Sequence, residues 1–149
     1  NNKQNVPSKI FRVPFGKASI TRRGKNLTII SIGYLSQVAL KISENLFESH
    51  KIDIEVIDLR TLSPLDTKTI IKSSKKTKKI LVLDPSWCSF GASAEIMSTI
   101  VENCSNDKIR IKRLAYPDSH TPASSSLEKE FYLSENKIKN TIMSLLKKK

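Results

Sequence analysis

Asp58 and Arg60 are the first residues whose types and spacing could act on a ligand, because an acid and a base lie two residues apart. They follow the β-branched residues Ile54, Val56 and Ile57, which predict a buried strand. Side chains two apart on a strand share a face, so the pair could bind a charged substrate. We favour a structural ion pair or a subunit contact, because nothing nearby in the sequence supplies a nucleophile with its base.

The same stretch continues through Pro64 to Asp66, which occupies the position of a helix N-cap. A buried strand that ends in charged residues and leads into a helix is typical of an α/β crossover. In such sheets the carboxyl ends of the strands carry the functional groups. We therefore predict that Asp58, Arg60 and Asp66 shape this strand end and an interface beside it.

The two histidines and two cysteines do not have the spacing of metal ligands. His120 lies in a long polar loop, where we expect it to face solvent or an interface. Cys88 precedes a helix whose N-terminus could activate a thiol, but we favour packing because no partner base is in view. The four glycines cannot build a G-x-G-x-x-G turn or a phosphate loop. The sequence therefore predicts no catalytic, cofactor-binding or metal-binding residue in this chain.

The chain has 149 residues and a formal net charge of +12. We interpret Lys72–Lys79 as a solvated helix end and Lys147–Lys149 as a frayed tail. Nucleic-acid readers gather arginines and aromatic residues on one face, a pattern that this chain lacks. No apolar run has the length of a membrane span, and no secretory segment is evident. We predict a cytoplasmic protein with two reduced thiols that binds neither nucleic acid nor membrane.

Apolar periodicity predicts an α/β fold, a three-layer α/β/α sandwich with a mostly parallel sheet of about five strands. Strands are expected at 18–22, 27–32, 52–59, 79–84 and 109–114. Helices are expected at 36–49, after Asp66, at 92–104 and after Ser134, with loops at 85–91 and 115–126. The first two strands should pair as a hairpin. Strands 27–32 and 52–59 should be parallel, because a helix joins them.

Short segments spread along the chain carry a family resemblance. Val13-Pro-Phe-Gly-Lys-Ala18 and Gly24-Lys-Asn-Leu-Thr-Ile-Ile30 come first, then Gly91-Ala-Ser-Ala-Glu-Ile96 and the residues Arg113, Asp118, Pro122, Leu127 and Glu128. In this order they resemble the C-terminal domain of the transketolase superfamily. Glu55-Val-Ile-Asp-Leu-Arg-Thr-Leu-Ser-Pro-Leu-Asp66 is similar to a signature of one branch. That branch is the beta subunit of 2-oxo acid dehydrogenases of the pyruvate or branched-chain type.

The resemblance implies a thiamine-diphosphate enzyme that decarboxylates a 2-oxo acid and passes the acyl group to a lipoyl carrier. It implies that other domains bind the cofactor and its Mg²⁺, namely a preceding pyrimidine-binding domain and a diphosphate-binding domain in the alpha subunit. After a linker at 1–12, the domain at 13–149 would build interfaces and be inactive alone. Its partners would be those domains, a second copy in a homodimer, and the lipoyl acyltransferase. We expect interface or structural roles for Asp58, Arg60, Asp66, Glu95 and His120.

Two segments depart from the pattern of this branch. Asp84-Pro-Ser-Trp-Cys-Ser-Phe-Gly91 stands in place of a Glu-Glu or Glu-Gly pair followed by a Gly-Gly-Phe-Gly turn, and three lysines end the chain. Both departures bear on acyltransferase docking. One alternative is another thiamine enzyme of the transketolase or deoxyxylulose-phosphate synthase type, against which Leu59-Arg-Thr-Leu-Ser63 argues. The other is a basic, non-enzymatic interaction module.

Overall fold

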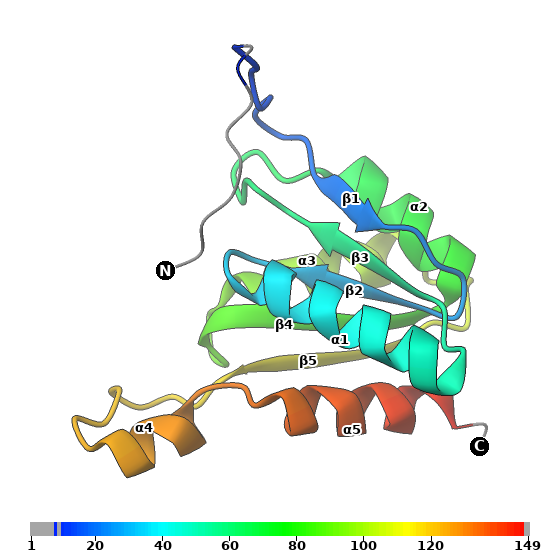
Figure 1. The fold of residues 1–149 in the computed structure, drawn as a ribbon. Coiled ribbons are helices and arrows are strands. Elements are labelled where there is room, and N and C mark those ends of the chain that lie inside the picture. Colours follow the sequence, from blue (N-terminus) through cyan, green and yellow to red (C-terminus); the bar gives the residue numbers. More distant parts are fainter. Residues whose placement is uncertain (1–7, 9, 148–149) are drawn as a thin grey trace.

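The computed structural model describes residue 8 and residues 10–147 (Figure 1). The strands are β1 (Ser19–Arg22), β2 (Leu27–Ser31), β3 (Ile54–Asp58), β4 (Lys79–Trp87) and β5 (Arg110–Tyr116). The helices are α1 (Leu35–His50), α2 (Thr67–Thr77), α3 (Ala92–Asn103), α4 (Ser125–Phe131) and α5 (Glu135–Leu146). The predicted linker at 1–12 falls mostly outside the described residues, and so do the last two lysines of the predicted tail.

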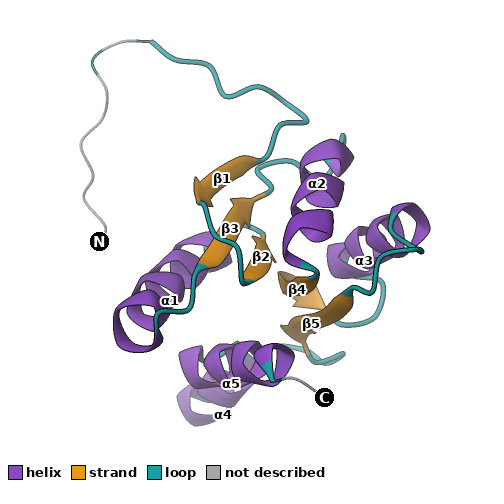
Figure 2. Cartoon of the chain, turned by 90° about the vertical axis from the view of Figure 1, so that its right-hand side faces the viewer, coloured by secondary structure: helices purple, strands orange, loops and turns teal. Residues whose placement is uncertain are grey.

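The strands form one sheet in the order β1-β3-β2-β4-β5. β3, β2, β4 and β5 are parallel, and β1 runs antiparallel to β3 at one edge. Alternate side chains enter two separate cores, so Leu27 and Ile29 of β2 face one way and Ile30 faces the other. Helices α1 and α5 cover the first face, and α2 and α3 cover the second (Figure 2). The predicted α/β fold with a mostly parallel sheet is confirmed.

The predicted hairpin between the first two strands is wrong, because β3 lies between them. The turn after β1 passes over the start of β3, where Lys25 N and Asn26 N donate to Asp53 O at 3.1 and 2.8 Å. Gly24 makes this crossing feasible, since a Cβ there would lie 2.3 Å from the carbonyl carbon of Ile54. The turn residues therefore connect two strands that flank a third.

The predicted loop at 85–91 is also partly wrong, because β4 continues to Trp87. After an irregularity that follows Leu83, Trp87 pairs with Tyr116 of β5. Cys88 N then donates to Tyr116 O at 2.8 Å. Pro85 cannot donate a ladder hydrogen bond, and an irregular stretch of strand tolerates this. The extension of β4 carries an aromatic side chain beyond the rest of the sheet.

Both outer edges of the sheet are poor templates for another strand. β1 has four residues and a register irregularity between Ile20 and Arg22. β5 carries Arg110 and Lys112, which reach the end of α5. Arg110 Nη2 donates to Ser144 O at 3.1 Å, and Lys112 Nζ lies 3.0 Å from Ser144 Oγ. β5 lies at the edge of the sheet opposite β1.

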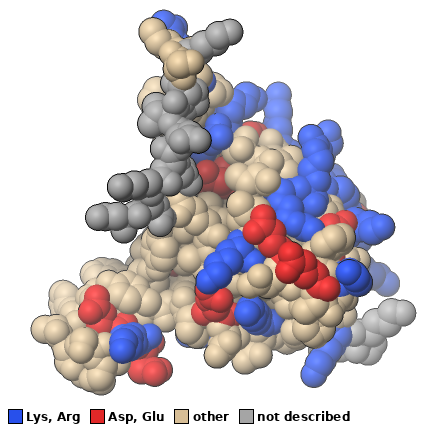
Figure 3. Space-filling view, in the orientation of Figure 1, with Lys and Arg blue, Asp and Glu red and all other residues tan. Residues whose placement is uncertain are grey.

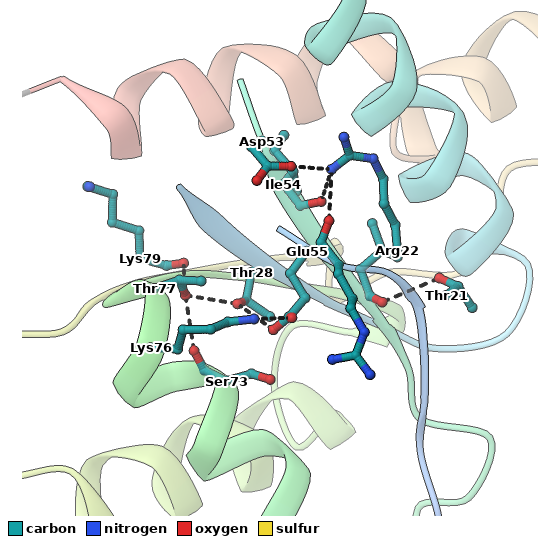
Figure 4. A network of polar contacts seen from close by, with 12 residues as sticks. Thr21, Arg22, Thr28, Asp53, Ile54, Glu55, Ser73, Lys76, Thr77 and Lys79 are labelled. Atoms are coloured by element: carbon teal, nitrogen blue, oxygen red, sulfur yellow. Dashed lines mark hydrogen bonds and ion pairs between the residues drawn. The ribbon is translucent and has the colours of Figure 1, made fainter. Parts of the chain in front are cut away.

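A buried carboxylate occupies the sheet face that α2 covers. Glu55 of β3 has no exposed surface, and its Oε2 forms an ion pair with Lys76 Nζ of α2. Thr28 Oγ1 lies 3.4 Å from Glu55 Oε1 and 2.8 Å from the hydroxyl of Thr77 (Figure 4). A buried charge needs a counter-charge and hydrogen bonds to offset its desolvation. This network therefore fixes the end of α2 against β2 and β3.

We expect Lys76→Met to lower the free energy of unfolding by about 3 kcal/mol, because Glu55 would keep its burial and lose its counter-charge. Urea unfolding followed by circular dichroism measures the change. Lys75→Met is the matched control, since Lys75 is exposed on the same helix, and its effect should stay within about 0.5 kcal/mol. Equal effects of the two substitutions would contradict the role given to the pair.

Candidate functional site

The carboxyl edge of the sheet gathers the residues that the sequence singled out. The parallel strands β2, β3, β4 and β5 end there, and β1 begins there because Ser19 lies opposite Asp58. Two open cavities lie along this edge. One, of about 410 Å³, lies at the ends of β2 and β3, and the other, of about 420 Å³, lies at the ends of β4 and β5.

Asp58 and Arg60 line the first cavity together with Gly33. Asp58 accepts a hydrogen bond from Ser36 Oγ at 3.0 Å, and its Oδ2 lies 4.0 Å from Arg60 Nε. The two side chains meet, but the strand does not align them as predicted, since β3 ends at Asp58. Arg60 has a φ of 56°, so a turn brings its side chain back toward Asp58. The arrangement is a partly exposed ion pair at the rim of a cavity.

Asp66 fastens the start of β1 to the start of α2. Its carboxylate caps the helix by accepting from Thr69 N at 3.2 Å and Thr69 Oγ1 at 2.8 Å, and it also accepts from Ala18 N at 3.0 Å. Burial alone would raise the pKa of Asp66. The three hydrogen bonds and the charge of Lys17 outweigh burial and hold that pKa below its ordinary value. The predicted N-cap is therefore confirmed.

Aromatic and aliphatic side chains make this edge unusually apolar for an exposed surface. We call the set the carboxyl-edge surface, and it consists of Phe15, Tyr34, Leu62, Trp87, Phe90 and Tyr132, all exposed. Phe90 is fully exposed, and Trp87 keeps 53% of its surface accessible. In Figure 3 lysines and arginines gather toward the side where the parallel strands begin, whereas the opposite side is mostly uncharged apart from α4. A patch of this kind marks a site of interaction.

Tyr116 and Tyr34 link the two ends of this surface. Their hydroxyl groups are hydrogen-bonded to each other, and the Tyr116 ring packs on Phe131 and Tyr132 with centroid distances of 5.1 and 5.3 Å. Burial, followed by the contact with the Tyr34 hydroxyl, raises the pKa of Tyr116 far above its ordinary value. The rings of Tyr116, Phe131 and Tyr132 form part of the wall of the second cavity.

His120 and Glu95, two further predicted residues, have different settings. The ring of His120 meets the edge of Trp87 at a centroid distance of 6.4 Å and lines a small cavity with Asp118. Asp118 accepts from Ser89 Oγ at 2.6 Å and Ser89 N at 2.8 Å, and these bonds hold the pKa of Asp118 below its ordinary value. Glu95 is exposed in the first turn of α3 and lies apart from this cluster. The interface or structural roles expected of His120 and Glu95 remain predictions.

Asp84 is a structural anchor of this edge that sequence reasoning missed. It is almost fully buried, and it accepts from Ser93 N at 2.6 Å and Ser86 Oγ at 2.6 Å. It thereby fixes the first turn of α3 and the end of β4. Gly91 packs against it, since a Cβ at Gly91 would lie 2.8 Å from Asp84 Oδ2. An aspartate that ends an apolar strand just before a serine-rich loop was the available signal.

Backbone strain is concentrated at the same edge. Among the described residues, four non-glycine residues have a positive φ, and Lys51 and Lys78 simply end α1 and α2. The other two are Arg60 and Phe90, which lie in the loops after β3 and β4. Strained residues that no helix end explains are typical of functional surfaces. The strain and the exposed aromatic rings therefore point to one region.

We expect Asp66→Asn to flatten the loss of stability in acid. The pKa of Asp66 in the folded state lies below its unfolded value, so the contribution of the carboxylate is complete above about pH 4 and is lost as the pH falls through the folded pKa. Urea unfolding between pH 2.5 and pH 7 measures this. Asp66→Ala should also cost about 1 kcal/mol at pH 7, because the cap is removed. Parallel pH profiles for Asp66→Asn and wild type would contradict the assignment.

Comparisons with known proteins agree on one family. A family model described as the C-terminal domain of transketolase matches residues 16–138. The mitochondrial beta subunit of the pyruvate dehydrogenase E1 component of Chaetomium thermophilum is 36% identical over 138 residues, which are 92% of this chain and 36% of that protein. The beta subunit of 2-oxoisovalerate dehydrogenase of Bacillus subtilis is 34% identical over 145 residues, or 96% of this chain and 44% of that protein.

A solved structure agrees with the fold. It is titled a split-gene transketolase, an inactive beta4 tetramer, and it matches with a TM-score of 0.76 and 20% identity over 91% of this chain and 44% of that one. The chain spans less than half the length of each of these relatives. Among the described helices, none is long and apolar enough to cross a membrane. Because the family model matches most of the chain, the protein belongs to the family of transketolase C-terminal domains.

Proposed function

We propose that this chain is the C-terminal assembly domain of the beta subunit of a thiamine-diphosphate-dependent 2-oxo acid dehydrogenase. The whole enzyme would decarboxylate a 2-oxo acid oxidatively and transfer the acyl group to a lipoyl carrier. The similar proteins named as beta subunits of pyruvate and 2-oxoisovalerate dehydrogenases support this choice over a transketolase. The likeness to a split transketolase has 20% identity and supports only the fold. A cytoplasmic location is part of the proposal.

The observation that carries the proposal is the carboxyl-edge surface. It is apolar and rimmed by the Asp58–Arg60 ion pair and by Asp118. Specific interfaces combine a central apolar and aromatic patch with a polar rim. β1 begins at this edge, so a domain joined before it would emerge there. We assign the surface to contacts with the remaining domains of the subunit and with the alpha subunit.

The cofactor and its Mg²⁺ belong to other domains in this proposal. Within the described part of the chain, no three His, Cys, Asp or Glu side chains lie close enough together to hold a metal ion. Carboxylates of the chain already accept hydrogen bonds from the N-termini of two helices, since Asp84 accepts from Ser93 N of α3 and Asp66 from Thr69 N of α2. A carboxylate at a helix N-terminus takes the place that a phosphate would need. These residues do not fit a diphosphate, and we expect the chain alone to be inactive.

Further partners follow from the same surface. A second copy in a homodimer and the lipoyl acyltransferase are both part of the proposal. The rings of Trp87 and Phe90 lie in the segment that departs from the family pattern, so they would set which partner binds. The basic interaction module is the weaker alternative, because the lysines and arginines in Figure 3 gather mainly toward the side opposite this surface.

The test is assembly of the complete subunit with its alpha partner. We expect Trp87→Ala with Phe90→Ala to weaken association by several hundredfold, because two aromatic anchors buried in an interface contribute about 2 kcal/mol each, or about 4 kcal/mol together. Size-exclusion chromatography measures assembly, and turnover of 2-oxo acids against sugar phosphates measures activity and separates the two enzyme classes. Val101→Ala is the control, since Val101 is 59% exposed on α3 and lies outside the carboxyl-edge surface.

Two results would overturn the proposal. One is wild-type assembly and turnover in the double variant and in Arg60→Ala. The other is turnover of sugar phosphates without turnover of 2-oxo acids.

A further inference from the structure

A second, smaller site lies between α2 and the edge of the sheet formed by β1 and β3. It is a cavity of about 260 Å³ whose walls include Ile20, Arg23, Lys72 and Ser73. Glu55 and Lys76 also line it. It shares no lining residue with the cavities of the carboxyl edge, and no part of the proposed function uses it.

The cavity carries uncompensated positive charge. Glu55, its one acidic side chain, is already paired with Lys76 and lies within reach of Thr28 Oγ1. Arg23 and Lys72 are exposed, and neither has an acidic partner among the described residues. The Glu55–Lys76 pair is neutral as a unit, so Arg23 and Lys72 together leave two positive charges facing the cavity.

Ser73 adds a hydroxyl group to the wall of the cavity. Only 3% of the surface of Ser73 is exposed, whereas its neighbour Lys72 is exposed. The residue lines the cavity, and its carbonyl oxygen accepts a hydrogen bond from the Thr77 hydroxyl at 3.2 Å. Figure 4 shows this side chain directed away from Thr77, which bonds to the Ser73 carbonyl oxygen instead. A serine hydroxyl in this wall can donate a hydrogen bond to a polar group that enters the cavity.

We propose that this cavity binds a small phosphate monoester. Such a group carries a charge of about −1.5 to −2 at neutral pH, which matches Arg23 and Lys72. Its oxygens can accept from the planar guanidinium of Arg23, from the Lys72 ammonium and from the Ser73 hydroxyl. The volume leaves room for a short organic part beside the apolar wall of Ile20. The Glu55–Lys76 pair fixes the floor of the site.

Isothermal titration of the full chain with glycerol 3-phosphate, at constant ionic strength, tests the proposal. We expect one site per chain and a Kd raised about tenfold or more by Arg23→Gln and by Lys72→Gln, because each removes a charge-assisted hydrogen bond. Ser73→Ala should raise the Kd by a few fold, roughly what one neutral hydrogen bond contributes. Lys75→Gln and Lys25→Gln are matched controls, since both residues are exposed and outside the cavity, and they should leave the Kd unchanged.

Three outcomes would overturn it. The first is the absence of saturable binding of glycerol 3-phosphate to the wild-type chain. The second is equal weakening by Lys75→Gln and Lys72→Gln, which would mean a general effect of surface charge. The third is binding of heparin without binding of the monoester, which would mean an extended anionic partner. Thermal unfolding of every variant confirms folding, and the exposed positions of Arg23 and Lys72 keep both substitutions compatible with it.

Discussion

The insertion of β3 between β1 and β2 is the constraint on which the rest of the structure depends. β3 pairs along its whole length with β2 on one side and takes β1 in the opposite direction on the other. This arrangement forces the turn at Gly24 across the backbone of Ile54, and it brings the start of β1 to the carboxyl edge. Asp66 then ties that start to α2 through Ala18 N. The pairing of β1 with β3 thus places the start of β1 at the carboxyl edge, where the exposed aromatic side chains lie.

Glu55 is a fully buried carboxylate in the sheet, where an apolar side chain would be usual. Because side chains alternate along a strand, Glu55 lies on the same face as Ile57 and Leu59, which are apolar and buried. A carboxylate here costs desolvation, and the Lys76 contact offsets part of that cost. The same carboxylate lines the cavity beside α2. The polar network and the cavity therefore share one residue, Glu55.

Sequence patterns predicted the layers, the parallel strands and the cap at Asp66, because periodicity and capping are local signals. They failed for the hairpin, since a short strand and a turn at Gly24 look the same whether or not a third strand intervenes. They stopped β4 at Asp84, because a proline ordinarily ends a strand and the pairing of Trp87 with Tyr116 is long-range. The contact of Asp58 with Arg60 was anticipated, but a turn produces it. Whether Phe90 packs inward or outward depends on neighbours distant in sequence, so its exposure could not be predicted.

The short, irregular β1 and the anchored cations of β5 have a consequence for how such domains can be combined. These features make both edge strands of the sheet poor partners for a strand of another chain. Strand exchange and fibre-like stacking are therefore disfavoured at either edge. Copies of the domain can then lie close together at high concentration without their sheets joining edge to edge. Within the part of the chain that the structure describes, the ends of the strands and the helical faces are the surfaces left for a neighbour to contact.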